Sequence, residues 1–174
     1  MITMDFKKVN NIALVIGKTE GHIDQSLFAR NILDEKNGPP PEINLFNEKN
    51  NGETLLKLID KGYVKSAHDV SLGGLITALS KMCIKGKKGV TLKKPVYLIN
   101  QFEYFFSEDQ GRYIIEIEKK DLKKVIEILD KNSVHYDEIG TVNEKELIID
   151  DKSKVSIDDL IKTHNYWLNN YMSK

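Results

Sequence analysis

The chain has 174 residues, and its 26 lysines and arginines balance 26 acidic residues to a formal net charge of zero. This balance argues against nucleic-acid binding, which needs surplus cationic charge to displace counterions from phosphates. It also gives no polybasic reason for membrane attachment, and no apolar run in the sequence is long enough to cross a bilayer. The hydrophobic content of 40% is sufficient for one globular core.

Neither the first residues nor the cysteine content indicates export. Asp5 and other polar residues stand where a signal peptide would carry its apolar stretch. Cys83 is the single cysteine and cannot form an internal disulfide, so we interpret it as a small core residue of an apolar helix. The four histidines show no metal-binding spacing. We therefore expect a cytoplasmic protein with no metal site formed by this chain alone.

In chain order, the first predicted element is a strand buried on both faces, an apolar run at 12–17 that ends in glycine. Asp24 is predicted to cap a short helix, and the prolines at 39–41 then interrupt the chain. A second helix is expected over 44–60. The residues of these helices expected to face inward are Leu27, Phe28, Ile32, Leu55, Leu56 and Ile59.

The middle of the chain is predicted to contain a short strand at 63–67, a polar turn at 68–74 and another helix. The apolar face of that helix carries Leu75, Leu79, Met82 and Cys83. The following stretch, 85–94, holds five lysines and two glycines. It is either a phosphate-attracting patch or a solvated hairpin or loop with lysines at its edge, and we favour the second interpretation.

The last third shows the clearest periodicity. It predicts a strand at 113–117, a helix opening at Asp121, strands at 139–142 and 146–149, and a final helix from Ser156. A strand–helix–strand–strand order is half of a ferredoxin-like arrangement. Because no linker divides the chain, we predict a single domain over 1–174, of α+β class, with helices packed on a mixed sheet.

The first candidate site segment, SAHDVSLGGL at 66–75, places two glycines at the entrance of an apolar helix. Glycines let a ligand approach the backbone, and a helix N-terminus offers free N–H groups to a phosphate. Asp69 is a candidate for holding a nucleotide's metal, and His68 or Ser71 for hydrogen-bonding a substrate. The alternative is that Ser71 caps the helix and the glycines allow close packing. The segment is neither a Walker A loop nor a dinucleotide fingerprint.

The second candidate segment, FSEDQGR at 106–112, is dense in polar groups just before a buried strand. Arg112 must be satisfied there by an acid, a phosphate or backbone carbonyl groups. It is one of two arginines among 26 cations, which indicates a geometry that lysine does not reproduce. The alternative is a capped turn in which Arg112 pairs with Glu108 or Asp109.

A third segment, GKTEGHIDQS at 17–26, also follows a predicted buried strand. The residues in it that could reach a ligand are Gly21, His22, Gln25 and Ser26. A loop that caps the next helix explains these residues equally well. Each of the three segments is ordinary by itself, and their combination is more specific.

The chain resembles the final domain of the phosphoribosylformylglycinamidine synthase family, large-subunit type, through ITMDFK, IALVIGKTEGHIDQSL, GPPPE, SAHDVSLGGL and FFSEDQGRY in this order. The resemblance covers essentially the whole chain. It implies the fold of the C-terminal domains of aminoimidazole ribonucleotide synthetase, selenophosphate synthetase and thiamine monophosphate kinase. The family contains an ATP-binding half and a C-terminal half twice, and this chain resembles the later C-terminal half.

The resemblance implies an ATP- and Mg²⁺-dependent amidation in purine biosynthesis. Formylglycinamide ribonucleotide is activated as an imino phosphate, and ammonia then displaces the phosphate to give the amidine. The implied partners are the other domains of the synthase, a glutaminase subunit that supplies ammonia, and a small accessory subunit. For the isolated chain we expect no cofactor, no catalytic residue and no activity.

Two residues depart from the family pattern. Leu72 stands where members usually carry aspartate, and Asp24 stands where many carry glycine. The absence of an aspartate at position 72 implies that this later C-terminal half is structural or lines a second, degenerate site. The ligand-binding candidates that the resemblance implies are His68, Asp69, Ser71, Gly73, Gly74, Ser107, Glu108, Gln110 and Arg112.

Two other functions remain open. The chain could be a stand-alone module of ferredoxin-like shape that binds a phosphate or another small ligand. It could also be a purely structural interaction domain, with Trp167 and the aromatic run at 102–106 at an interface.

Overall fold

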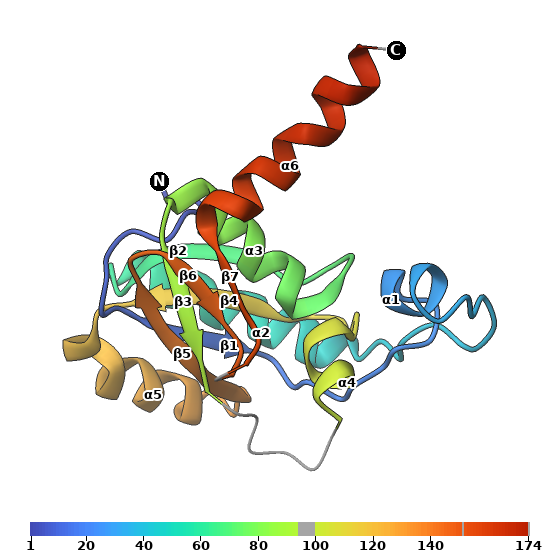
Figure 1. Cartoon of the computed structure of the whole chain (residues 1–174). Coiled ribbons are helices and arrows are strands. Elements are labelled where there is room, and N and C mark those ends of the chain that lie inside the picture. Colours follow the sequence, from blue (N-terminus) through green and yellow to red (C-terminus); the bar gives the residue numbers. More distant parts are fainter. Residues whose placement is uncertain (94–99, 151, 174) are drawn as a thin grey trace.

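The fold is built on one seven-stranded sheet, seen in a computed structural model that describes residues 1–93, 100–150 and 152–173 (Figure 1). The strands are β1 (Ile12–Ile16), β2 (Val64–Asp69), β3 (Gly89–Leu92), β4 (Tyr113–Ile117), β5 (Tyr136–Asn143), β6 (Glu146–Ile148) and β7 (Lys154–Ser156). The helices are α1 (Leu27–Asn31), α2 (Leu45–Asp60), α3 (Gly74–Gly86), α4 (Gln101–Phe106), α5 (Leu122–Lys131) and α6 (Ile157–Met172), with a 3-10 turn at Lys119–Asp121.

The sheet order β2-β4-β1-β5-β3-β6-β7 contains a ferredoxin-like unit. β1 runs antiparallel to β4 and β5, and β4 runs antiparallel to β2. The connection through α2 therefore links the parallel strands β1 and β2 around β4, and α5 links β4 and β5 around β1. β3 pairs in parallel with β6, which makes the sheet mixed. The predicted α+β class, with helices on a mixed sheet, is confirmed.

The central strand β1 is buried on both faces, as its continuous apolar run predicts. Ile12, Leu14 and Ile16 pack in the cluster that holds the inner faces of α2 and α5. Ala13 and Val15 pack in the opposite cluster, with α3. The two layers of helices thus fix the register of β1, because a slip by one residue would exchange both sets of side chains.

Helix α3 presents the predicted apolar face to the sheet. Leu75, Leu79, Met82 and Cys83 are all buried in one cluster. Burial raises the pKa of the Cys83 thiol to about 12. Cys83 is therefore a protonated core residue, as the sequence analysis predicts, because a nucleophilic cysteine needs an accessible thiolate.

The predicted cap of the first helix is wrong. Ser26, and not Asp24, is the N-cap of α1, and its Oγ accepts a hydrogen bond from the Ala29 N–H at 3.1 Å. Asp24 lies against Gly38 instead. Asn44 caps α2 in the same way, by accepting a bond from the Asn47 N–H at 3.0 Å, so the predicted start of that helix is confirmed.

Some side chains predicted to face inward are exposed. Leu56 is 60% exposed, because Leu55 and Leu58 occupy the inner face of α2. Leu27 and Ile32 are also exposed, since α1 is a short helix away from the main sheet (Figure 1). The apolar character of a single residue is thus a weak indicator of which helix face is buried.

The lysine-rich stretch is not the predicted solvated hairpin or loop. Helix α3 continues through Gly86, and Gly89–Leu92 forms β3 between β5 and β6. Val90 and Leu92 are buried, so only part of the stretch is solvated. Lys94 lies outside the described residues. The prediction failed because the strands that cover β3 come from the C-terminal third of the chain.

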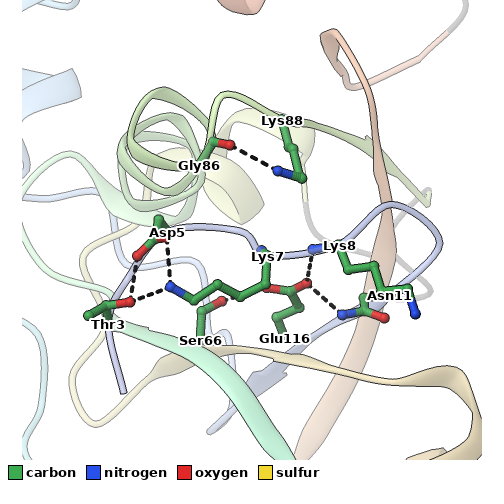
Figure 2. A network of polar contacts seen from close by, with 9 residues as sticks. All are labelled: Thr3, Asp5, Lys7, Lys8, Asn11, Ser66, Gly86, Lys88 and Glu116. Carbon is green, nitrogen blue, oxygen red and sulfur yellow. Dashed lines mark hydrogen bonds and ion pairs between the residues drawn. The ribbon is translucent and has the colours of Figure 1, made fainter. Parts of the chain in front are cut away.

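The N-terminal segment is attached to the sheet through the buried carboxylate of Glu116 (Figure 2). This carboxylate accepts hydrogen bonds from the backbone N–H groups of Lys7 and Lys8, at 2.7 and 3.0 Å. It also accepts from the Asn11 amide at 2.7 Å and the Ser66 hydroxyl at 2.9 Å. A buried charge needs such partners, because an unsatisfied carboxylate would lose its hydration without compensation.

Helix α6 packs on the body through its first turns and then projects away from it (Figure 1). Ile157 is buried, and Leu160 and Ile161 pack against the same cluster. Farther along, Trp167 is 67% exposed and stacks on Tyr171, with ring centroids 5.4 Å apart. The described chain therefore carries an exposed aromatic surface on this helix.

Candidate functional site

The candidate residues gather at one edge of the sheet, where three strands meet loops. Asp69 ends β2, Ile16 ends β1 and Tyr113 begins β4. Because β4 is antiparallel to both other strands, Tyr113 lies opposite both Ile16 and Asp69. The three candidate segments therefore lie next to one another in space, although the sequence separates them.

His68 and Asp69 belong to β2 and not to the turn, where the sequence analysis placed them. His68 Nδ1 lies 3.0 Å from Asp69 Oδ1. The His68 side chain is 10% exposed, and its Nε2 atom is buried without a hydrogen-bond partner in the described part of the chain. Asp69, by contrast, keeps 63% of its side chain exposed. Of these two residues, Asp69 is the one that presents its polar group to solvent.

The glycine turn depends on backbone conformations that favour glycine. Gly73 and Gly74 have φ values of +82° and +69°. A Cβ atom on Gly74 would lie 2.6 Å from the Ser107 carbonyl oxygen, so the turn packs directly against the second segment. Ser71 is exposed, and Gly73, not Ser71, is the N-cap of α3. The alternative that Ser71 caps the helix is therefore wrong, and the glycines allow close packing against residues 105–107 at the end of α4 instead of the expected packing of helix on sheet.

The amide groups of this turn are not free, contrary to the sequence-based expectation. The Gly73 N–H donates to Glu108 Oε1 at 2.8 Å, and the Gly74 N–H donates to the Ser71 carbonyl at 2.9 Å. The same Glu108 Oε1 accepts from the Leu27 N–H at 2.8 Å. An internal carboxylate thus stands at the start of α3, where an anionic ligand would otherwise find donors.

Asp109 is the most highly connected residue of the second segment, and the sequence analysis did not select it as a site residue. Its carboxylate accepts hydrogen bonds from the consecutive N–H groups of Glu20, Gly21 and His22, at 3.0 to 3.1 Å. It also accepts from the Ser107 hydroxyl at 3.0 Å. In the sequence, only its position beside Glu108, just before a buried strand, indicated that Asp109 could belong to the site.

Arg112 is buried and is satisfied inside the protein. It donates to the Ser107 carbonyl at 2.8 Å, to Thr19 Oγ1 at 3.1 Å and to the Asp109 carbonyl at 3.3 Å. Its Nη2 also lies 3.8 Å from Asp109 Oδ2, so the predicted pairing with that acid is present. Burial lowers the pKa of Arg112, while the charge of Asp109 opposes this shift.

A cleft of about 640 Å³ opens beside this cluster, on the side of α2. Its lining includes Lys18, Gly21, His22, Asn44, Gln110 and His135. Of the residues that the sequence predicts to reach a ligand, Gln110, Gly21 and His22 line the cleft, and the glycine turn does not. In the third segment, Gln25 donates to the carbonyl groups of Lys36 and Gly38, and Ser26 caps α1, so these two residues serve the loop. The edge thus has two exposed parts, which are the cleft and the region of Asp69 and Ser71.

The described ranges 1–93, 100–150 and 152–173 contain no group of three or more His, Cys, Asp or Glu side chains placed to hold a metal ion. Within the same ranges, no helix is long and apolar enough to cross a membrane.

The fold has relatives among solved structures. Thermotoga maritima PurL complexed with FGAR matches 92% of this chain and 29% of its own, with a TM-score of 0.75 and 20% sequence identity. At this identity the likeness concerns the fold alone.

Curated sequences provide closer relatives. The phosphoribosylformylglycinamidine synthase subunit PurL of Pelagibacter ubique is 77% identical over 172 residues, which cover 99% of this chain and 24% of the relative. The subunit of the same name from Bartonella henselae is 36% identical over 174 residues, or 100% of this chain and 24% of the relative. The chain therefore spans 24% of the length of these relatives.

Residues 8–152 match the family described as AIR synthase related protein, C-terminal domain. This match covers most of the chain and confirms the resemblance inferred from the motifs, so the chain belongs to the family of AIR synthase related proteins, as a C-terminal domain.

Proposed function

We propose that the chain is the C-terminal domain of a phosphoribosylformylglycinamidine synthase of purine biosynthesis. The observation that carries this proposal is the 77% identity to the P. ubique subunit over 99% of the chain. Because the match runs through the candidate loops as well as the sheet, it supports a shared function and not only a shared fold. We also propose that residues 1–174 form one domain, since both hydrophobic clusters share one sheet.

The proposed reaction of the whole synthase is the ATP- and glutamine-dependent conversion of formylglycinamide ribonucleotide to its amidine. Structures of T. maritima PurL with ATP and with FGAR support these two ligands. The structure of PurLQS from the same organism supports an assembly with further subunits, which we assign as the glutaminase and the small accessory subunit. We also assign Mg²⁺ to the reaction and the cytoplasm as its location.

For this domain we propose a structural role and a contribution to a second, degenerate site. Asp69 and Ser71 are the exposed polar candidates on one side, with His68 behind them, and Gln110 is the candidate on the cleft side. Gly73 and Gly74 provide the close turn, while Ser107, Glu108 and Arg112 support the loops. Leu72 is 62% exposed where the family usually carries aspartate, so Asp69 would have no acidic neighbour at that position for a metal. The residues that the structure describes around Asp69 do not fit a Mg²⁺ site.

The experiment is an amidation assay with purified components. We expect the full-length synthase that contains this chain to form the amidine from formylglycinamide ribonucleotide, ATP and glutamine when the glutaminase and accessory subunits are added. The 174-residue chain alone should form none. Absence of turnover by the complete assembly would refute the proposal, and turnover by the chain alone would refute the structural role.

A stand-alone module for a small ligand is the second candidate, because the polar cleft has the size of a small-molecule site. Calorimetry of the 174-residue chain with ADP separates the two functions. A domain that supplies only part of a nucleotide site should bind weakly or not at all. A sub-micromolar dissociation constant would favour the stand-alone module.

A further inference from the structure

Two adjacent carboxylates hold two different loops at the candidate edge. Glu108 links the start of α1 to the glycine turn, since its Oε1 accepts from the N–H groups of Leu27 and Gly73. Asp109 holds the loop after β1 through the N–H groups of residues 20–22. The Glu108 N–H adds a link to the same loop by donating to the His22 carbonyl at 3.1 Å.

We propose that Glu108 and Asp109 are positioning residues that join the glycine turn and the 17–26 loop into one ligand-facing surface. The identity of the ligand, a nucleotide, rests on the proposed function. The positioning itself rests on the hydrogen bonds, which belong to this chain. In this view Asp109 and the Oε1 atom of Glu108 do not contact the ligand, because backbone donors already occupy them.

The residues that support this pair are buried and hydrogen-bonded. Ser107 and Arg112 are buried, and the guanidinium of Arg112 bonds both the 107–109 backbone and Thr19 of the neighbouring loop. A Cβ atom on Gly17 would lie 2.6 Å from the Gly111 carbonyl oxygen, so the two segments touch at the backbone. Buried, fully bonded groups hold a surface more precisely than a solvated loop does.

The exposed groups lie on the backbone that the pair holds. Gly21 and His22, whose N–H groups bond Asp109, line the cleft. Ser71 and Asp69 precede Gly73, whose N–H bonds Glu108. Loss of either carboxylate should therefore release one side of the surface and weaken a ligand that uses both.

The test replaces each carboxylate by its amide, Asp109→Asn and Glu108→Gln, with Glu116→Gln as the matched control. All three changes remove a charge that accepts backbone hydrogen bonds while keeping the side-chain size. Glu116 lies near the other end of β4 and holds the N-terminal segment, outside the proposed surface (Figure 2).

Amide hydrogen exchange of the 174-residue chain measures the positioning directly. Asp109→Asn should raise exchange at residues 20–22 at least about tenfold, and Glu108→Gln should do so at Leu27 and Gly73. Because loop amides exchange by local opening, Glu116→Gln should raise exchange at Lys7 and Lys8 and leave it unchanged at residues 20–22, Leu27 and Gly73. Unchanged exchange at residues 20–22 in Asp109→Asn would overturn the proposal.

Binding of ADP to the full-length synthase measures the consequence for the ligand. At a temperature where every variant is folded, Asp109→Asn and Glu108→Gln should each raise the dissociation constant of one class of sites about tenfold or more, whereas Glu116→Gln should change it less than about twofold. Equal weakening by the control would reduce the role of the pair to general stability and overturn the proposal. If the unaltered synthase binds no ADP, the proposed function fails, and the exchange measurement still decides the positioning.

Discussion

Two buried carboxylates, one before β4 and one near its end, use the same chemistry for different purposes. Glu116 accepts from two backbone N–H groups, an amide and the hydroxyl of Ser66. Asp109 accepts from three backbone N–H groups and the hydroxyl of Ser107. Glu116 holds a segment that covers the sheet, whereas Asp109 holds a loop that lines a cleft.

The comparison teaches that the satisfaction of a buried charge does not reveal its role. Both carboxylates meet the requirement that buried polar groups find partners. What distinguishes them is the surface presented by the backbone that each one holds. Substitutions distinguish the Glu116 cluster, which is Glu116 with its hydrogen-bond partners, from the Asp109 cluster, which is Glu108 and Asp109 with theirs.

Glu116→Gln should produce the largest loss of stability. The amide nitrogen of glutamine would face N–H donors in a fully buried site, and a charge-assisted acceptor would be lost. We expect the free energy of unfolding to fall by about 3 kcal/mol and Tm by about 6–12 °C, measured by calorimetry. Glu118→Gln is the control, since Glu118 pairs with Lys120 at the surface, where solvent screens the pair, and it should leave Tm nearly unchanged. Similar Tm values for both variants would contradict this ranking.

Gly74→Ala should destabilise the glycine turn, which Glu108 holds in the Asp109 cluster. The left-handed φ of +69° and the 2.6 Å approach of a Cβ to the Ser107 carbonyl both oppose a side chain there. We expect a loss of about 2 kcal/mol in denaturant unfolding. Gly52→Ala in α2 is the matched control, because its Cβ would lie 3.7 Å from the Tyr113 hydroxyl, and it should stabilise by about 0.5–1 kcal/mol. A neutral Gly74→Ala would show that the turn can move away from residues 105–107.

Ser66→Ala and Ser107→Ala form a matched pair, one for each carboxylate. Each removes one hydroxyl donor, at 2.9 Å from Glu116 and 3.0 Å from Asp109. Each should cost about 1–2 kcal/mol in the free energy of unfolding. Only Ser107→Ala should also raise amide exchange at residues 20–22. Equal exchange in both variants at those residues would remove the distinction between the clusters.

The smallest expected effect is a pH dependence of stability that arises from Asp5, which bonds Lys7 beside the Glu116 cluster. Hydrogen bonds from Lys7 and Thr3 lower the pKa of Asp5 from its ordinary value of 3.8 to about 2. A depressed carboxyl pKa adds stability that is present above 3.8 and is lost as the pH falls toward 2. The loss of Tm on acidification through this window should therefore be slightly greater for the unaltered chain than for Asp5→Asn. An identical slope would mean that solvent screens the interaction completely.

The sequence by itself determined the features that depend on local periodicity and on composition. The alternation at 113–117 and the apolar run at 12–17 predict strands that the structure contains, and the start of the helix after Asn44 is also correct. The combination of motifs identified the family before any contact was known. These signals succeed because side-chain periodicity and capping act over a few residues.

Only the tertiary structure decided the contacts that join distant segments. β3 is an inner strand because β5 and β6, from later in the chain, pair with it. Asp109 is a central residue because its N–H donors lie 87 to 89 positions away in the sequence. Glu108 accepts from the Gly73 N–H, one of the turn amides that the local sequence suggested were free for a ligand. Hydrogen bonds between distant residues leave no periodic trace, so the sequence marked the edge as polar, and folding determined which polar groups hold the loops and which face outward.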